Sequence, residues 1–203
     1  LFVTDIATTG ISAVETADVQ LGDSVAALAQ GPIGLCATAG ARLRGAGLVI
    51  AVDANPTRLE MAEATGADIV IDYTQEDPVA KVKALTDGRG ADVAIEALGI
   101  QETFANCLKA VRPAGIVSSL GVYGDKVTIP LEPFIYGIGD IDIRTTLCPG
   151  GKKRLGALMT LVKTCRLNLG QLITHRFALD EIEEAYSLFS NQEDGVIKVA
   201  VTP

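Results

Sequence analysis

The stretch from Ser24 to Asp53, SVAALAQGPIGLCATAGARLRGAGLVIAVD, decides the fold. Its apolar run Val25 to Leu28 is short and hydrophobic on both faces, as buried parallel strands are, and it ends at the turn Gly31-Pro32-Ile33-Gly34. A helix is expected after the turn, and a second apolar strand, Leu48 to Val52, then leads to Asp53. Strand, glycine turn, helix, strand and acid in this order predict a dinucleotide-binding unit.

Each part of this unit has a physical reason to hold such a ligand. Gly31 lets the backbone approach a pyrophosphate, Gly34 lets helix and strand pack closely, and the helix N-terminus offers free N–H groups to the phosphates. Asp53 can accept hydrogen bonds from the adenosine ribose hydroxyls, and its charge would repel a 2′-phosphate. Ala29 replaces the first glycine of G-x-G-x-x-G, and its methyl group crowds a tight turn. A structural turn or another adenosine ligand is therefore the alternative interpretation.

Composition argues against several classes of partner. The 203 residues are 48% hydrophobic and carry a formal net charge of -8. Nucleic acids and anionic membranes attract basic surfaces, so we expect neither as the main partner. We expect no membrane span and no signal peptide, and hence a cytoplasmic protein. The four cysteines, Cys36, Cys107, Cys148 and Cys165, form no C-x-x-C pair and are expected to be reduced and mostly structural.

Strands alternate with helices beyond Asp53. Asn55 and Pro56 are typical of an N-cap and first helical residue. Later strands are expected at Ile69 to Ile71, Val93 to Ile95 and Gly115 to Leu120, and helices at Pro78 to Leu85 and Thr103 to Val111. This alternation predicts an α/β fold with a Rossmann-type doubly wound parallel sheet, which binds ligands at the carboxyl ends of its strands.

The flanking segments are less regular. We expect a helix from Ile11 to Val19, a strand-like segment at Val127 to Ile129, a sixth strand within Ile141 to Leu147, a helix from Lys152 to Cys165 and a closing strand from Val196 to Val201. Asp180 is expected to cap a helix in which Ile182, Ala185, Tyr186 and Phe189 share a face. His175, the only histidine, is interpreted as structural rather than catalytic.

Seven segments, TDIATTG, GPIGL, ARLRGAG, IAVD, TLCPGG, ITHRF and VIKVAV, are similar to segments at corresponding places in the zinc-containing medium-chain alcohol dehydrogenases, specifically the bacterial secondary-alcohol branch. The resemblance covers nearly the whole chain and implies the cofactor-binding domain of such an enzyme. We expect residues 1–22 to be a crossing helix and linker from a catalytic domain absent here, residues 23–150 the Rossmann domain, and residues 151–203 the C-terminal helices and closing strand that complete it. The abrupt opening without methionine is typical of a fragment.

The resemblance also implies roles for particular residues. Asp5 would be a ligand of the catalytic Zn²⁺, where many relatives carry cysteine, with the other ligands supplied by the absent domain. Thr9, the candidate catalytic residue, would contact the nicotinamide face. The backbone at Val122 would meet the carboxamide. Lys198 would lie near the pyrophosphate, and Cys148 would lie near substrate or at a subunit contact, or simply pack. Ala97, Leu98 and Gly99, after the fourth strand, are also expected to bind the cofactor, since a flat ligand can lie against the backbone at Gly99; the alternative is that Gly99 serves only as a turn glycine.

The implied activity is oxidation of alcohols, especially secondary ones, to ketones by hydride transfer to nicotinamide. The best-known secondary-alcohol members prefer NADP and carry Gly-Ser-Arg where this chain has Asp53-Ala54-Asn55, so we expect NAD. A homodimer or homotetramer is expected, with the sixth-strand region as the dimer edge. The alternatives are a polyol or threonine dehydrogenase, a non-catalytic nucleotide-binding module, and an adenosyl-methionine methyltransferase.

Overall fold

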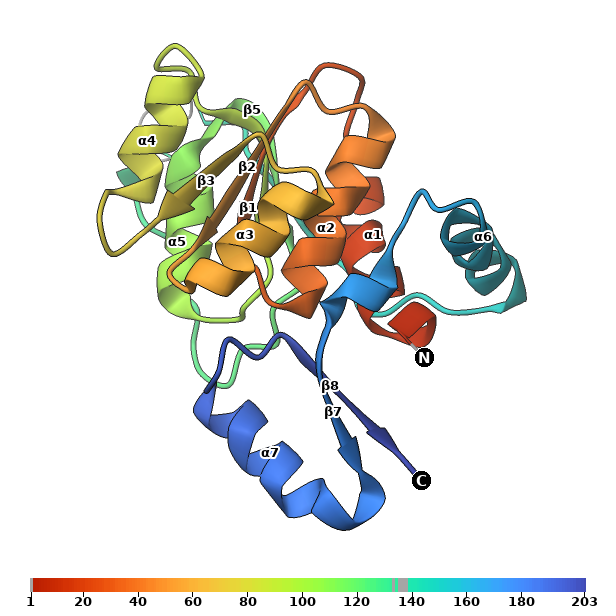
Figure 1. The fold of residues 1–203 in the computed structure, drawn as a ribbon. Coiled ribbons are helices and arrows are strands. Elements are labelled where there is room, and N and C mark those ends of the chain that lie inside the picture. Colours follow the sequence, from red (N-terminus) through yellow and green to blue (C-terminus); the bar gives the residue numbers. More distant parts are fainter. Residues whose placement is uncertain (1, 133, 135–138) are drawn as a thin grey trace.

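A computed structural model describes residues 2–132, 134 and 139–203, and its centre is a parallel sheet (Figure 1). Six strands lie in the order β3-β2-β1-β4-β5-β6. They are β1 (Ser24–Leu28), β2 (Leu48–Asp53), β3 (Ile69–Asp72), β4 (Ala91–Glu96), β5 (Val111–Ser119) and β6 (Asp142–Thr145). Every neighbouring pair is parallel. The strand order reverses between β1 and β4, which confirms the doubly wound fold that the sequence predicts.

Helices cover both faces of this sheet. On one face lie α1 (Ile6–Thr16), α2 (Pro32–Arg44) and α3 (Pro56–Thr65), and on the other lie α4 (Pro78–Leu85) and α5 (Gln101–Ala110). The alternating side chains of β1 separate the two cores: Val25 and Ala27 pack with α1 and α2, whereas Ala26 and Leu28 pack with α4 and α5. Strand β1 is therefore buried along its whole length, as its apolar sequence predicts.

Helix α1 packs directly against α2. A Cβ on Gly10 would lie 2.5 Å from the Cβ of Cys36, and one on Gly40 would lie 2.9 Å from Cδ1 of Ile11. The prediction of a helix from Ile11 to Val19 was wrong at both ends. Ile6 and the residues after it are buried and extend the helix toward the N-terminus, whereas Asp18 adopts a left-handed backbone (φ +52°) that ends it.

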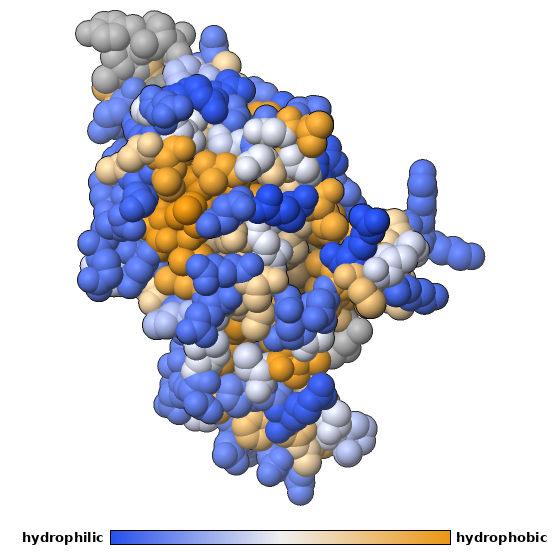
Figure 2. All heavy atoms as spheres, turned by 45° about the horizontal axis from the view of Figure 1, so that its top comes forward, coloured by the Kyte–Doolittle hydropathy of each residue, from blue (hydrophilic) through white to orange (hydrophobic). Residues whose placement is uncertain are grey.

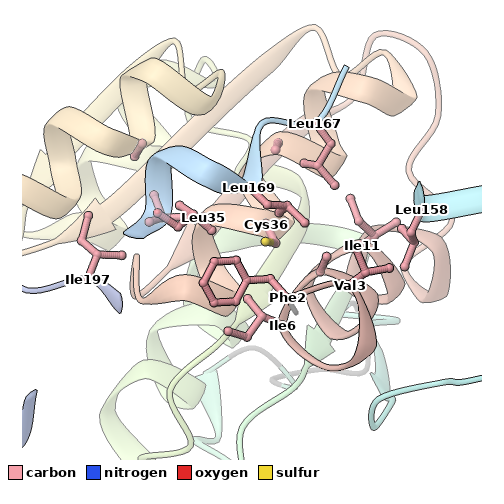
Figure 3. Packing of buried hydrophobic residues seen from close by; sticks show 14 of the residues in the cluster. Phe2, Val3, Ile6, Ile11, Leu35, Cys36, Leu158, Leu167, Leu169 and Ile197 are labelled. Atoms are coloured by element: carbon pink, nitrogen blue, oxygen red, sulfur yellow. The ribbon is translucent and has the colours of Figure 1, made fainter. Parts of the chain in front are cut away.

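Segments far apart in sequence meet in one hydrophobic cluster over α2 (Figure 3). Phe2 and Val3 belong to the short 3-10 helix η1 (Phe2–Thr4), and Leu169 to another, η3 (Leu169–Leu172). Helix α6 (Lys152–Lys163) contributes Leu158. These side chains pack with Leu35 and Cys36 of α2, so the N-terminal and C-terminal segments are both anchored on the Rossmann core.

The last segment forms a separate unit that projects below the sheet in Figure 1. Strands β7 (Ile173–Ala178) and β8 (Lys198–Thr202) pair in parallel with each other, and α7 (Ile182–Asn191) connects them. The expected closing strand thus pairs with β7 and does not join the six-stranded sheet.

Two local expectations were wrong. Asp180 does not cap α7, because a short 3-10 helix, η4 (Leu179–Glu181), precedes it and Glu181 instead accepts a hydrogen bond from the backbone N–H of Ala178 at 2.8 Å. The segment Val127 to Ile129 is not a strand. Its backbone at Thr128 is held by the side chain of Gln101 at 2.6 and 2.8 Å, which takes the place of a strand partner.

The surface is mixed. Figure 2 shows a patch of hydrophobic residues surrounded by hydrophilic side chains on the face in view. Among the described residues, no helix combines the length and hydrophobicity that crossing a bilayer requires.

Candidate functional site

The turn between β1 and α2 is built around a close backbone contact. A Cβ on Gly34 would lie 1.9 Å from the carbonyl oxygen of Ala29, so only glycine allows the helix to approach the strand this closely. Gly31 occupies the N-cap position of α2, with Pro32 as the first helical residue, followed by Ile33. A Cβ on Gly31 would meet no atom within 4 Å. The N-terminus of α2 therefore faces open space, where an anionic group can approach its free N–H groups.

Asp53 lies beside this turn at the carboxyl end of β2. Its carboxylate accepts hydrogen bonds from three backbone N–H groups: Oδ2 from Gln30 at 2.7 Å, and Oδ1 from Ala54 at 2.8 Å and Asn55 at 2.9 Å. Only 6% of the residue is exposed. These contacts fix the orientation of a negative charge next to the glycine turn.

A buried polar network around Gln30 stabilises the turn, and sequence patterns did not predict this network. Gln30 is fully buried; its side-chain amide donates to the carbonyl of Ala27 at 2.8 Å and accepts from the hydroxyl of Thr38 in α2 at 2.9 Å. The network connects β1, the turn and α2. Because an unpaired buried amide is costly, these bonds hold Gln30 in one position.

A cavity of about 250 Å³ opens at the point where the strand order reverses. Among its lining residues are Asp53, Arg58, Tyr73, Leu98 and Gln192. The guanidinium Nη1 of Arg58 lies 3.9 Å from Asp53 Oδ2, and its Nε is buried without a hydrogen-bond partner. An unpaired donor next to a fixed carboxylate gives the cavity polar groups suited to a sugar or phosphate. The sequence signal for Arg58 was a basic residue in the first turn of the helix that follows Asp53, and it was overlooked.

The loops after β4 and β5 also meet at this edge of the sheet. Gly99 has a left-handed backbone (φ +93°), and a Cβ there would lie 2.7 Å from the carbonyl oxygen of Val122. Ala97 donates its N–H to the carbonyl of Leu28 at 3.2 Å, and Leu98 lines the cavity. The structure thus brings the expected cofactor-binding residues of both loops together with the glycine turn.

Asp5 and Thr9 lie at the start of α1. The hydroxyl of Thr9 donates to Oδ1 of Asp5 at 3.5 Å, and Sγ of Cys148 donates to the carbonyl of Thr4 at 3.5 Å. The loop after β6 therefore packs on η1, just before the start of α1. In the described part of the chain, no three His, Cys, Asp or Glu side chains come together in a group that could hold a metal ion. A carboxylate is an ordinary zinc ligand, but Asp5 by itself does not make a zinc site.

Lys198 and His175 lie in the unit formed by β7, β8 and α7. The Nζ of Lys198 lies 5.4 Å from the centroid of the Phe189 ring, in a hollow that is separate from the Asp53 cavity. That hollow is lined by the α7 face expected from the sequence, Ile182, Ala185, Tyr186 and Phe189. His175 contacts Asp194 at 3.1 Å and Thr174 at 2.9 Å, which favours the structural interpretation.

Comparison with known proteins agrees with this geometry. Residues 32–164 match the family model of the zinc-binding dehydrogenases. Over all 203 residues the chain is 52% identical to an alcohol dehydrogenase of Cupriavidus necator and covers 56% of it. It is 36% identical to the NADP-dependent isopropanol dehydrogenase of Thermoanaerobacter brockii, with 99% of this chain and 58% of that protein aligned.

Among solved structures, alcohol dehydrogenase TADH from Thermus sp. ATN1 superposes on the whole chain with a TM-score of 0.90 and 33% identity, over 57% of its own length. The chain thus spans little more than half the length of the relatives it matches. The glycine turn, the acid that follows it, the order of the strands and these matches all agree. The chain therefore belongs to the zinc-binding dehydrogenase family.

Proposed function

We propose that this chain is the cofactor-binding part of a zinc-dependent alcohol dehydrogenase that uses NAD to interconvert secondary alcohols and ketones. The observation that carries the proposal is the Asp53 carboxylate, fixed by three backbone N–H groups beside the glycine turn and the cavity. A carboxylate with this orientation accepts hydrogen bonds from ribose hydroxyls.

The remaining residues have roles along the cofactor. The pyrophosphate lies on Gly31 at the N-terminus of α2, and the adenosine occupies the cavity lined by Asp53 and Arg58. The nicotinamide extends toward Thr9, the loop Ala97 to Gly99 and the Val122 backbone. Lys198 lies over the Phe189 ring in a hollow separate from the Asp53 cavity, and it would have to leave that ring to reach the pyrophosphate. These residues hold the nicotinamide ring in one orientation for hydride transfer.

NAD is favoured over NADP by charge. A 2′-phosphate on the adenosine ribose would lie next to the fixed Asp53 carboxylate, and like charges repel. The isopropanol dehydrogenase of Thermoanaerobacter brockii is named NADP-dependent. Arg58 lies 3.9 Å from Asp53 and offsets part of that charge, so the preference depends on the balance between these two side chains.

Zinc enters the proposal through Asp5 alone. In the whole protein, Asp5 serves as one ligand and groups beyond the described residues complete the site. Bound zinc would supply a Lewis acid that polarises the alcohol oxygen.

The partners follow from the same proposal. The substrate is a small alcohol or ketone, and the protein is cytoplasmic. Copies associate as a dimer or tetramer through the edge strand β6, where Ile143 is 38% exposed. A side chain of this kind on an open sheet edge favours pairing with another strand.

Calorimetric titration with NAD, NADP and adenosyl-methionine tests the proposal. We expect NAD to bind best. The variant Asp53→Gly should bind NAD about tenfold more weakly and lose its discrimination against NADP, because it loses both the ribose acceptor and the repelling charge. Asp72→Asn, at the residue paired with Asp53 in register on β3, is the matched control and should change neither affinity. Preference for NADP in the unmodified protein would refute the choice of NAD. Binding of adenosyl-methionine alone would refute the dehydrogenase function.

A further inference from the structure

The last residue of β4, Glu96, is a fully buried carboxylate. Acidic side chains are almost never completely buried unless they are paired, because desolvation of the charge is costly. Glu96 forms none of the ion pairs found among the described residues, and its hydrogen-bond donors there are neutral. The role of Glu96 is therefore to be found in the chain segments that carry these donors.

One oxygen of Glu96 binds the loop after β4. Oε1 accepts from the backbone N–H of Leu98 at 2.9 Å, from that of Gly99 at 2.8 Å and from the hydroxyl of Thr103 in α5 at 2.7 Å. These three bonds fix the path of the chain from the strand into the helix.

The other oxygen binds the loop after β5. Oε2 accepts from the hydroxyl of Tyr123 at 2.8 Å and from that of Ser119 at 3.3 Å, and these two hydroxyls lie 2.8 Å apart. Burial is the main cause that raises the pKa of Tyr123; the hydrogen bond with Ser119 lowers this pKa and the one to Glu96 raises it, and on balance the phenol keeps its proton and donates it. The Tyr123 ring also packs edge-on against Phe104 with centroids 5.9 Å apart, which fixes the phenol from its other side.

The two loops touch with no space between them. A Cβ on Gly121 would lie 2.3 Å from Oε2 of Glu96 and 2.3 Å from the Cα of Gly99. A Cβ on Gly99 would in turn lie 2.7 Å from the carbonyl oxygen of Val122. A displacement of either loop therefore breaks hydrogen bonds to Glu96 or drives backbone atoms into contact.

We propose that Glu96 is a positioning residue that clamps the loop after β4 to the loop after β5 and so sets the Val122 backbone against the nicotinamide half of the cofactor. This inference rests on the proposed function, since it assumes that a nicotinamide dinucleotide lies along this edge. The adenosine half lies in the cavity with Asp53 and Arg58, and Leu98 and Thr103, which Oε1 of Glu96 holds, line the same cavity. The described lining of that cavity does not include Tyr123 or Ser119, which Oε2 holds. Loosening the Oε2 side of the clamp therefore weakens mainly the nicotinamide end of the binding site.

Binding of NAD and of ADP-ribose, which lacks the nicotinamide, separates the two ends. In the full protein, Tyr123→Phe removes one bond of the clamp, and we expect it to weaken NAD binding about tenfold while ADP-ribose affinity stays within about twofold. Ser119→Ala is a second, smaller change at the same oxygen and should act in the same direction. Tyr186→Phe, at a tyrosine that is 69% exposed on α7, makes the same chemical change away from the clamp and should alter neither affinity.

A rescue series tests Glu96 itself. Glu96→Gln keeps an acceptor for the β4 loop and places an amide that can donate to the hydroxyls of Ser119 and Tyr123, whereas Glu96→Ala keeps neither. We expect the glutamine variant to restore most of the NAD affinity that the alanine variant loses.

Equal weakening of both ligands by Tyr123→Phe and Ser119→Ala, or no weakening of either, would overturn the clamp and leave the proposed function intact. If the unmodified protein binds neither NAD nor ADP-ribose, the proposed function is overturned, and the clamp with it.

Discussion

Ala29 holds the turn after β1 in a left-handed backbone (φ +73°), a conformation that usually falls to glycine. Its N–H donates to the carbonyl of Val52 at 2.9 Å. The side-chain amide of the adjacent Gln30 is hydrogen-bonded to Ala27 and to Thr38, so the surrounding structure maintains the strained backbone. The departure from the glycine pattern therefore leaves the path of the turn intact. The residue that cannot change is Gly34, which contacts the carbonyl of Ala29.

Alanine at the two turn glycines should have different effects. Gly34→Ala places a methyl group 1.9 Å from a backbone oxygen and should lower the free energy of unfolding by about 2 kcal/mol or more, because the helix must move away from the strand. Gly31→Ala, where the methyl group meets no protein atom, should leave stability within about 0.5 kcal/mol but weaken NAD binding. Urea unfolding and calorimetry measure the two quantities. Equal stability losses in both variants would contradict this account.

At the scale of the elements, a polar cluster ties the amino ends of three strands together. Asp92 accepts from the N–H and hydroxyl of Ser24 on β1 at 2.9 and 2.6 Å, from Arg112 on β5 at 2.6 Å and from Arg89 at 2.6 Å. Burial by itself would raise the pKa of Asp92, but the hydrogen bonds from Arg89, Ser24 and Arg112 outweigh it and hold this pKa well below its ordinary value. The charged form is thus the one that the fold stabilises.

This lowered pKa gives stability a definite pH dependence. Because the folded-state pKa lies below the unfolded one, the contribution of Asp92 is complete above the unfolded value of about 4 and is lost as the pH falls below it. Asp92→Asn should lower the free energy of unfolding by about 1–3 kcal/mol at pH 7, and its difference from the unmodified protein should shrink below about pH 4. Thermal unfolding across pH measures this, with the exposed Asp180→Asn as control. A difference that does not change with pH would argue against the charge as its cause.

At the scale of the whole molecule, the cluster over α2 connects both ends of the chain to the Rossmann core (Figure 3). Ile197 is 1% exposed and belongs to this cluster, immediately before β8. A Cβ on the nearby Gly195 would lie 2.5 Å from Oγ1 of Thr57, so the same segment also contacts α3. The C-terminal unit is therefore attached through the segment before β8 and through Ile173 at the start of β7, which packs against the same cluster.

Truncation of Ile197 should weaken this attachment. Ile197→Ala should lower the free energy of unfolding by about 2–5 kcal/mol, because it leaves a cavity between the C-terminal segment and α2. Val201→Ala on the same segment, where the side chain is 39% exposed, should cost well under that. Urea denaturation followed by circular dichroism compares the two. Equal effects would show that Ile197, although buried in the cluster, contributes no more to stability than the partly exposed Val201.

Periodicity predicted most of the central sheet, because β1, β2 and β4 are buried on both faces and α2 and α3 begin and end with local signals. The start of α3 is an example: Asn55 accepts from the N–H of Arg58, and Pro56 occupies the first helical position, as the sequence indicates. The positions of Gly31, Gly34 and Asp53 could likewise be predicted, since their spacing reflects the local geometry of one strand, one turn and one helix.

Contacts between segments that are distant in the sequence could be seen only in the folded chain. No local pattern shows that Glu96 holds two loops together or that β8 pairs with β7 instead of the central sheet. Hydrophobic periodicity and capping act over a few neighbouring residues, so they determine the helices and strands and the sequence positions of the glycine turn and Asp53. Buried polar pairing and strand choice depend on which distant segments meet when the core packs, and therefore only the folded chain determines them.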